Sequence, residues 1–330
     1  MALVLREDDV RALLTMPEVV AVLDAAFRQQ GEGHTRNQPR TRIITPGNTG
    51  VLHVLSAYVP GQPGHPEHEG SGLLGLKTYA ALPSDVRFAV LLFSAGDGRL
   101  LAIIEADVLG QMRTGAASGV ATRYLAREDA RTLGLIGTGG QARTQALAVC
   151  AVRPIERIWV YGRDEARRAS FAEEVALLTG VDTVPVASAE EAVRAADIVV
   201  TATTAREPIV RGEWLRPGTH LNVMGSNWGN RREVDTVTVE RSAVVAVDAL
   251  DQAHIEAGDL VLPASEGRFD WTRAVELGSI VAGVAPGRTD PHQITLFKSL
   301  GIGLEDVATA GLVYTFAQQR GVGQEIEFLS

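Results

Sequence analysis

The chain has 330 residues, and its 31 basic and 40 acidic residues give a formal net charge of −9. The chain is longer than one ordinary hydrophobic core can organise, so we expect two structural units. With 45% hydrophobic residues, both units should fold without disulfides. The acidic balance excludes a general attraction to nucleic acid, although a local basic pocket for a small acid stays open.

The first third of the chain is predicted to be an α+β unit with an antiparallel sheet. Residues 15–18 read Thr-Met-Pro-Glu, a capping box with proline in the first turn, and apolar residues follow at helical spacing to about Gly31. Short β-like segments then replace the helical period, among them residues 50–55 and 88–93, and turns such as residues 96–98 separate them.

After Arg113 strands and helices alternate, which predicts a doubly wound parallel sheet. The predicted strands are residues 132–136, 157–161, 182–186, 197–201, 219–224 and 243–247. Helices are predicted to begin at Gln141, at Asp164 and at the capping box of residues 188–191. An apolar C-terminal helix over residues 304–319 could pack on either unit.

The first strand of this alternating region runs into Gly137-Thr138-Gly139-Gly140-Gln141-Ala142, a Gly-x-Gly-x-x-Ala pattern. Gly137 would allow a tight turn, Gly139 would let the backbone approach a pyrophosphate, and Ala142 would let the helix pack closely on the strand. The helix N-terminus would supply N–H donors to the anion. The alternative is a packing turn without a ligand, but a preceding strand and a following helix favour a dinucleotide site.

The end of the second strand is where the choice between NADP and NAD is expected. No carboxylate stands at the strand tip to accept the ribose 2′-hydroxyl. Gly162 removes the side chain there and Arg163 could pair with a 2′-phosphate, which favours NADP(H), while NAD(H) stays possible. Asp164 could cap the next helix or reach the ribose.

Polar residues also follow the fourth and fifth strands, in Thr201-Ala202-Thr203-Thr204 and in Met224-Gly225-Ser226-Asn227. Open parallel sheets bind ligands at the carboxyl ends of their strands, so these segments are expected to face the nicotinamide. For each hydroxyl taken singly, turn or cap chemistry is an equal explanation.

Outside the alternating region, four cationic residues are considered as candidates for binding a small acid. Lys77, in a stretch that is otherwise apolar to neutral, is either a solvated charge at a strand edge or a partly buried amine for binding or proton transfer. Arg113 precedes a helix of small residues and could hold a substrate carboxylate bidentately. Arg40 and Arg42 alternate along a probable strand and would share a face.

Several other kinds of site are not expected. His65 and His68 lie with two glutamates in a Gly/Pro-rich loop without helical spacing or a third ligand, so a metal is not predicted. Cys150, the single cysteine, is interpreted as a small core residue. The start of the chain lacks a basic segment before a long apolar one, and no apolar run is as long as a membrane span, so a cytoplasmic protein is expected.

Six segments spread over nearly the whole chain resemble the ornithine cyclodeaminase/mu-crystallin family. They are residues 39–41, 75–77, 112–117, 137–142, 232–235 and 294–301. The most specific are the Arg-Thr-Gly-Ala-Ala entry and the Thr-Leu-Phe-Lys-Ser-Leu-Gly segment. The resemblance implies a homodimer with a substrate-binding and dimerisation domain over residues 1–115 and 305–330, and a Rossmann dinucleotide-binding domain over residues 116–304.

The resemblance also implies roles for particular residues. Arg40, Lys77 and Arg113 match the family's carboxylate-binding and acid/base positions. The cofactor-binding residues would be Thr114, Gly137, Thr138, Gly139, Gly140, Gln141, Ala142, Gly162, Arg163, Asp164, Thr201, Ala202, Thr203, Met224 and Ser226. In the cyclodeaminases an aspartate after the fifth strand carries deamination and ring closure, whereas this chain has Asn227, which cannot act as a carboxylate base.

The hypothesis that follows is an NAD(P)H-dependent reductase of a small imino acid, or equivalently an amino-acid dehydrogenase. Arg113, helped by Arg40, would hold the substrate carboxylate, the nicotinamide would give a hydride to the imine carbon, and Lys77 would give the proton to nitrogen. Asn227 would donate a hydrogen bond to the substrate or the nicotinamide. The alternatives are a cyclodeaminase with bound NAD and a non-catalytic NADPH-binding protein.

Overall fold

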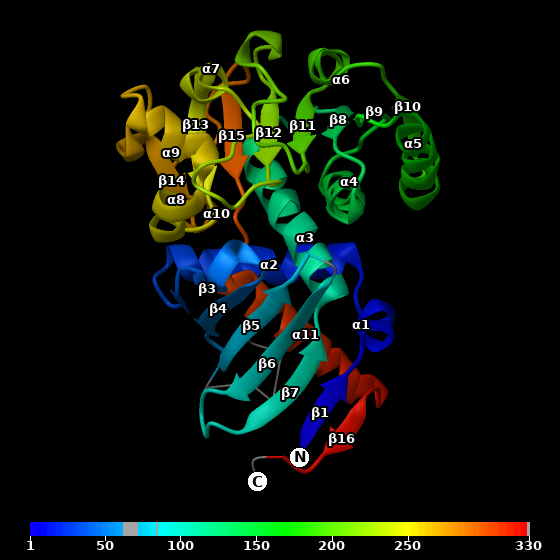
Figure 1. The fold of residues 1–330 in the computed structure, drawn as a ribbon, viewed down its shortest axis with the longest axis vertical. Helices are drawn as coiled ribbons and strands as arrows, with labels where there is room; N and C mark the ends of the chain where they lie inside the picture. Colours follow the sequence, from blue (N-terminus) through cyan, green and yellow to red (C-terminus); the bar gives the residue numbers. More distant parts are fainter. Residues whose placement is uncertain (62–71, 84, 329–330) are drawn as a thin grey trace. The chain divides into compact units, whose positions relative to one another are not determined.

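The computed structural model describes residues 1–61, 72–83 and 85–328. The chain divides into two compact units: unit 1 contains residues 1–113 and 301–330, and unit 2 contains residues 114–300. Figure 1 shows the helices and strands of both units. The cluster between His65 and Glu69 lies outside the described residues.

Unit 1 is built on an eight-stranded sheet in the order β16-β1-β7-β6-β5-β4-β2, with β3 also paired to β4. Its strands are β1 (Ala2–Leu5), β2 (Arg36–Asn37), β3 (Thr41–Ile44), β4 (Val51–Val59), β5 (Leu73–Ala81), β6 (Val86–Ser94), β7 (Leu100–Glu105) and β16 (Gln324–Ile326). Its helices are α1 (Glu7–Leu13), α2 (Met16–Gly31), α11 (Gly303–Arg320) and the 3-10 turn η1 (Pro46–Asn48). The strands from β4 to β7 are antiparallel, as predicted, whereas β1 pairs with β7 in parallel, because it comes from a distant part of the chain and not from a hairpin.

Helix α11 packs on one face of the unit 1 sheet, against β4 and β5. The approach is close: a Cβ on Gly75 would lie 2.9 Å from a methyl of Val307, and a Cβ on Gly303 would lie 2.8 Å from the backbone of Ser56. The sequence pattern left open which unit this helix joins. Its packing brings the first turn of α11, which carries Glu305 and Asp306, beneath the sheet.

Unit 2 contains a fully parallel sheet in the order β10-β9-β8-β11-β12-β15-β13-β14, which confirms the predicted doubly wound fold. Its strands are β8 (Thr132–Ile136), β9 (Arg157–Tyr161), β10 (Asp182–Pro185), β11 (Ile198–Thr201), β12 (His220–Val223), β13 (Ser242–Val247), β14 (Ala274–Glu276) and β15 (Ile294–Lys298). Its helices are α4 (Gly140–Val152), α5 (Glu165–Thr179), α6 (Ala189–Ala195), α7 (Thr236–Arg241), α8 (Leu250–Glu256), α9 (Gly258–Ser265) and α10 (Leu277–Val281), with 3-10 turns η2 (Gly212–Trp214) and η3 (Trp271–Arg273). Helix α3 (Asp107–Leu125) begins in unit 1 and continues into unit 2.

Strand β15 was not predicted, and it lies between β12 and β13. The chain passes from β13 to β14 at the sheet edge and then returns to insert five residues beside β12. Such a return depends on pairing with strands that are distant in the sequence, and a segment of only five residues carries little periodic signal. As a consequence, Lys298 stands at the carboxyl end of a central strand.

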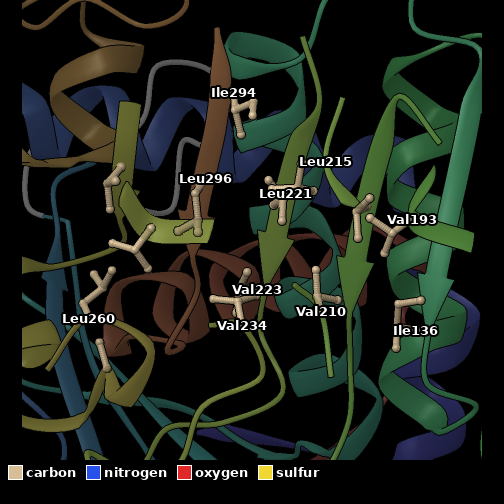
Figure 2. Packing of buried hydrophobic residues seen from close by; sticks show 14 of the residues in the cluster. Ile136, Val193, Val210, Leu215, Leu221, Val223, Val234, Leu260, Ile294 and Leu296 are labelled. Atoms are coloured by element: carbon tan, nitrogen blue, oxygen red, sulfur yellow. The ribbon is translucent and has the colours of Figure 1, made fainter. Parts of the chain in front are cut away.

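Apolar side chains cover both faces of the unit 2 sheet, as expected for parallel strands buried on each side. Leu133 and Leu135 of β8 belong to one buried cluster, and the next residue, Ile136, belongs to the other. Figure 2 shows the cluster that contains Ile136, in which Val223 of β12 lies beside Val234 of the following loop. This packing fixes the ends of the strands.

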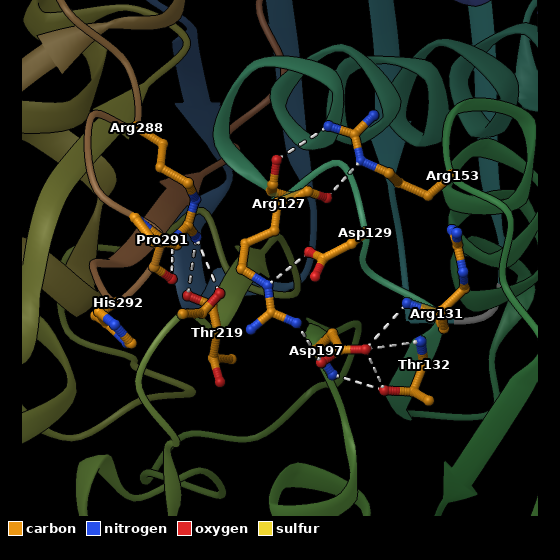
Figure 3. A network of polar contacts seen from close by, with 12 residues as sticks. Arg127, Asp129, Arg131, Thr132, Arg153, Asp197, Thr219, Arg288, Pro291 and His292 are labelled. Atoms are coloured by element: carbon orange, nitrogen blue, oxygen red, sulfur yellow. Dashed lines mark hydrogen bonds and ion pairs between the residues drawn. The ribbon is translucent and has the colours of Figure 1, made fainter.

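A polar network holds the C-terminal end of α3 in unit 2 (Figure 3). Arg153 donates hydrogen bonds to the carbonyls of Thr122, Ala126 and Arg127, and Arg288 donates one to the carbonyl of Leu125. The last carbonyls of a helix lack the full set of partners that its interior has, and the two guanidinium groups supply donors to them and to the two residues that follow.

Candidate functional site

The turn between β8 and α4 has the geometry of an anion-binding turn. Gly137 has φ +123°, and a Cβ at this position would collide with the carbonyl of Ala202, so the backbone excludes any side chain here. Gly139 has an ordinary φ of −99°, and a Cβ on it would meet nothing within 4 Å. Packing therefore does not require Gly139, and the space above it is open to a ligand. This observation favours a dinucleotide over a packing turn.

A pocket of about 270 Å³ lies along this turn, entirely within unit 2. It is lined by Ile136, Gly137, Thr138, Gly139, Tyr161, Gly162, Arg163, Arg167, Ala202, Thr203, Thr204, Ala205 and Ile209. The pocket sits where the strand order reverses, since β8 is flanked by β9 on one side and by β11 on the other. Open parallel sheets bind their ligands at this switch point.

Other predicted cofactor residues surround the same turn. Gly140 and Gln141 begin α4, and Ala142 is buried in the first turn of the same helix. The carbonyl of Thr114 accepts a hydrogen bond of 3.1 Å from the Gln145 side chain, which ties α3 to α4 within unit 2. Thr114 thus lies beside the helix whose N-terminus forms the turn.

The end of β9 is where the adenosine half of a dinucleotide would bind. A Cβ on Gly162 would lie 2.7 Å from the Thr138 methyl, so the turn leaves no room for an acidic side chain here. Asp164 is the N-cap of α5 and accepts a hydrogen bond of 2.8 Å from the Arg167 amide. Arg163 and Arg167 line the pocket.

The ends of β11 and β12 are joined by a carboxylate that sequence reasoning missed. The fully buried Glu233 accepts hydrogen bonds from the Thr201 hydroxyl at 2.8 Å and from the Thr203 amide and hydroxyl at 2.8 and 2.6 Å. It also accepts one from the Gly225 amide at 2.6 Å. Burial raises the pKa of Glu233, although the charge of Lys298 opposes the rise.

The other residues that were predicted to bind the cofactor at the ends of β11 and β12 are near the Glu233 ligands in sequence. Ala202 and Thr203 line the pocket, while Met224 and Asn227 are half-buried after β12. Ser226 is buried, and its carbonyl accepts a hydrogen bond of 2.6 Å from Lys298. Thr201 faces Glu233, so its hydroxyl acts within the protein.

Two of the predicted cationic residues of unit 1, Lys77 and Arg113, contact two carboxylates of α11. Lys77 of β5 is 2% exposed, and its ammonium lies 2.7 Å from Asp306. Arg113 lies 2.7 Å from Glu305 through Nη1 and 2.9 Å from Asp306 through Nε. Asp306 is therefore shared by Lys77 and Arg113. Because charges on opposite ends of the chain meet here, no local pattern in the sequence revealed the pair.

Arg40 joins the same cluster through two neutral groups. It donates hydrogen bonds to the Tyr79 hydroxyl at 2.7 Å and to the Gly301 carbonyl at 3.0 Å. The Tyr79 ring stacks on His53, with ring centroids 4.3 Å apart. Three cations and two carboxylates give this buried cluster a net charge of +1 when all are ionised, which suits one bound carboxylate.

The charges of this cluster perturb two pKa values. Burial and the positive charge of Arg113 lower the pKa of Lys77 to about 8, against the opposing effect of Asp306. Burial and the charges of Arg40 and Arg42 lower the pKa of His53 to about 4, so His53 is neutral near pH 7. An amine that titrates near neutrality is suited to proton transfer.

A count of residue types gives one signal that sequence reasoning overlooked. Among the 31 basic residues only Lys77 and Lys298 are lysines, and both are buried on a carboxylate. All exposed basic positions of the described chain are arginines or histidines. Lysine is thus confined to the two interior positions.

Three further expectations concern the single cysteine, metal binding and membrane-spanning helices. Cys150 is half-buried against an apolar cluster, and burial raises its pKa to about 11, which supports the structural interpretation. Among the described residues no group of His, Cys, Asp and Glu could hold a metal ion. In the same part of the chain no helix has the length and apolar character needed to cross a membrane. The cytoplasmic location stays a prediction.

Comparison with known proteins agrees with the geometry. The model of the ornithine cyclodeaminase/mu-crystallin family matches residues 1–321. A Δ1-pyrroline-2-carboxylate reductase from Bacillus cereus is 35% identical over 334 residues, which cover 99% of this chain and all of the relative. The Δ1-pyrroline-2-carboxylate reductase of Thermococcus litoralis, solved with NADH and L-proline, matches with TM-score 0.91 and 39% identity over 98% of this chain and all of that one. An archaeal alanine dehydrogenase dimer with bound NAD matches with TM-score 0.90 and 30% identity over 99% of both chains.

Proposed function

Because the chain belongs to the ornithine cyclodeaminase/mu-crystallin family, we propose that it is an NAD(P)H-dependent reductase of a small imino acid. The reaction adds a hydride to the carbon of a C=N bond beside a carboxylate and a proton to the nitrogen. The observation that carries the proposal is the buried cluster of Arg40, Lys77 and Arg113, in which one titratable amine lies among guanidinium groups. The reverse reaction is the oxidation of an amino acid.

The two units have separate tasks in this proposal. Unit 1, which nearly coincides with the predicted domain of residues 1–115 and 305–330, binds the substrate and forms the dimer. Unit 2, which nearly coincides with the predicted domain of residues 116–304, binds the dinucleotide at the turn from Gly137 to Ala142, whose open space above Gly139 fits a pyrophosphate. Bound there, the nicotinamide supplies the hydride.

The residues of unit 1 bind the substrate and manage the proton. Arg113, oriented by Glu305 and Asp306, holds the substrate carboxylate with help from Arg40. The Lys77 ammonium donates its proton to the imine nitrogen and is re-protonated from solvent. Asn227 donates a hydrogen bond to the substrate or the nicotinamide and takes no proton.

Net charge narrows the substrate class. A cluster with one excess positive charge is neutralised by a monocarboxylate, whereas a dicarboxylate would leave a second anionic group in need of a partner. The proposed substrates are therefore cyclic or open-chain imines of monocarboxylic acids. L-Proline, the ligand of the Thermococcus litoralis protein, belongs to this class.

The proposal is tested by measuring NADPH and NADH oxidation with cyclic imino acids and with 2-oxo acids plus ammonia or methylamine. Oxidation that depends on a monocarboxylic imine is the expected result. Ammonia release from ornithine without net oxidation would instead indicate a cyclodeaminase. Cofactor binding without turnover of any compound in the panel would indicate a binding protein.

We further propose that NADP(H) is preferred. Thr138 excludes a side chain at Gly162, Asp164 is engaged as a helix cap, and Arg163 and Arg167 offer two guanidinium groups at the pocket. A 2′-phosphate would accept hydrogen bonds from these two arginines. A ribose 2′-hydroxyl, in contrast, would find no free carboxylate there to accept its hydrogen bond. The solved relatives described above contain NADH and NAD, so this preference distinguishes the chain from them.

Replacing Arg163 with alanine is expected to weaken NADPH binding about tenfold or more and NADH binding less than twofold, because only NADPH carries the phosphate that Arg163 contacts. Fluorescence titration of each reduced cofactor measures both dissociation constants. Arg157→Ala, at an exposed ion pair with Asp182, is the control and should change neither. Equal losses for the two cofactors would contradict the assignment.

A homodimer is proposed from the unit 1 sheet. On the face that alternates with the side chains beneath α11, Leu52 and Leu74 are 39% and 45% exposed, and Leu76 and Phe93 line a groove of about 340 Å³. A second copy of the chain would cover these apolar groups. Sedimentation equilibrium should give the mass of two chains, and the mass of one chain would contradict the proposal.

A further inference from the structure

The Glu233 carboxylate joins the ends of two central strands. Its Oε1 accepts from the amide and hydroxyl of Thr203, and its Oε2 accepts from the Thr201 hydroxyl and the Gly225 amide, at 2.6 to 2.8 Å. Thr201 is the last residue of β11, Thr203 follows that strand, and Gly225 follows β12. Four donors thus converge on one side chain that has no exposed surface.

The backbone around this carboxylate leaves no room for another arrangement. A Cβ on Gly225 would collide with Glu233 and with the backbone of Thr203. Position 225 must therefore be glycine for the carboxylate to reach both strands. The main chain of Glu233 is fixed as well, since its carbonyl accepts from the amides of Ile209 and Val210 at 2.8 and 3.1 Å.

Two further buried charges support Glu233. One oxygen of Asp259 accepts from the amides of Glu233 and Val234 at 2.6 and 3.0 Å, and the other lies 2.9 Å from the Lys298 ammonium. Lys298 in turn donates to the carbonyl of Ser226 at 2.6 Å. This frame of Glu233, Asp259 and Lys298 therefore holds the residues after β11 and the residues after β12 together.

Stability alone does not explain such a frame, because apolar residues of similar volume usually stabilise an interior as well as buried charges do. Its location indicates a purpose. Thr203, which Glu233 holds through two hydrogen bonds, lines the pocket beside the Gly137 turn. A dinucleotide that places its pyrophosphate on that turn and its adenosine over β9 extends its other half over β11 and β12.

We propose that Glu233 is a positioning residue that fixes the strand ends for the nicotinamide half of the cofactor. This inference rests on the proposed function, since it assumes that unit 2 binds a nicotinamide dinucleotide. Glu233 acts through Thr203 and Gly225 and touches no reacting atom.

An amide cannot replace the carboxylate in this position. Each oxygen of Glu233 receives a backbone N–H, from Thr203 on one side and from Gly225 on the other. In Glu233→Gln the side-chain NH₂ would face one of these N–H groups, and a buried donor would lose its acceptor. The strand ends would then move apart while the shape of the side chain is almost unchanged.

The test compares binding of NADPH or NADH, whichever the wild type binds more tightly, with binding of the corresponding ADP-ribose, which lacks nicotinamide. We expect Glu233→Gln to raise the dissociation constant of the reduced dinucleotide at least tenfold and that of the ADP-ribose less than twofold. Calorimetry measures both ligands without turnover. Glu240→Gln, which alters a surface ion pair with Arg268, is the control and should change neither.

Thr201→Val provides a second variant if Glu233→Gln fails to fold. It removes one hydroxyl donor but keeps the charge of Glu233 and both of its hydrogen bonds to backbone amides. It should weaken binding of the dinucleotide about threefold without affecting binding of the ADP-ribose. Equal weakening of both ligands, or no change in either, would overturn the positioning role. If the wild type binds neither NADPH nor NADH, the proposed function itself fails together with this inference.

Discussion

Lys77→Met is expected to lower kcat for imine reduction by about 100- to 10,000-fold, the usual contribution of a positioned proton donor. Methionine matches the length of the buried stem but has no proton to give. Asp306 keeps its contact of 2.9 Å with Arg113, so the cluster retains an ion pair when the amine is removed. Stopped-flow absorbance of the reduced cofactor measures the rate of hydride transfer, and fluorescence titration measures cofactor binding.

Cofactor binding should be unchanged in Lys77→Met, because the predicted pyrophosphate turn lies in unit 2 and Lys77 in unit 1. Lys77→Arg is the matched variant: it restores the positive charge, but a guanidinium does not release its proton near neutral pH. It should therefore bind substrate and still turn over slowly. Full turnover in either variant would show that the proton comes from another group.

Asp306→Asn is expected to shift the pH dependence of imine reduction toward acid. In the wild type the pKa of Lys77 is about 8, so kcat/KM should fall about tenfold per pH unit above pH 8 as the amine loses its proton. Asp306 is the group that raises this pKa against burial and the charges of Arg113 and Arg40. Without its charge the pKa of Lys77 falls further, and the protonated form is populated only at lower pH.

At pH 8 the Asp306→Asn variant should therefore lose about 5-fold or more in kcat/KM, since a neighbouring opposite charge shifts a pKa by about 1–3 units. Much of this loss should be recovered near pH 6. The oxidative direction needs the neutral amine and should show the opposite trend. Asp182→Asn, at an exposed ion pair with Arg157, is the control. A pH profile identical to that of the wild type would contradict the role of Asp306.

Local signals in the sequence were sufficient for much of the fold. The capping box at Thr15 begins α2, Asp164 and Ser188 cap α5 and α6, and the turn at Gly137 connects β8 to α4. These features depend on residues within a few positions of one another, so periodicity and capping reveal them directly. The alternation after Arg113 then leaves few topologies for a parallel sheet.

Pairings between distant residues required the tertiary structure. Lys77 and Asp306 are separated by 229 positions, and Thr203 and Glu233 by 30, with nothing in either local pattern to connect them. An acidic pair in the first turn of α11 is equally consistent with an exposed helix start, because Glu and Asp favour helix N-termini in any setting. The insertion of β15 between β12 and β13 is of the same kind.

The sequence by itself thus determined that the chain has an α+β unit and a doubly wound parallel sheet. It also determined the family, the glycine turn and the three cations of unit 1. Only the tertiary structure decided which carboxylates neutralise those cations and that a buried glutamate joins the ends of β11 and β12. The physical reason is that helices, caps and turns form from neighbouring residues, whereas the charge state and alignment of a buried site depend on groups that the folded chain brings together from far apart.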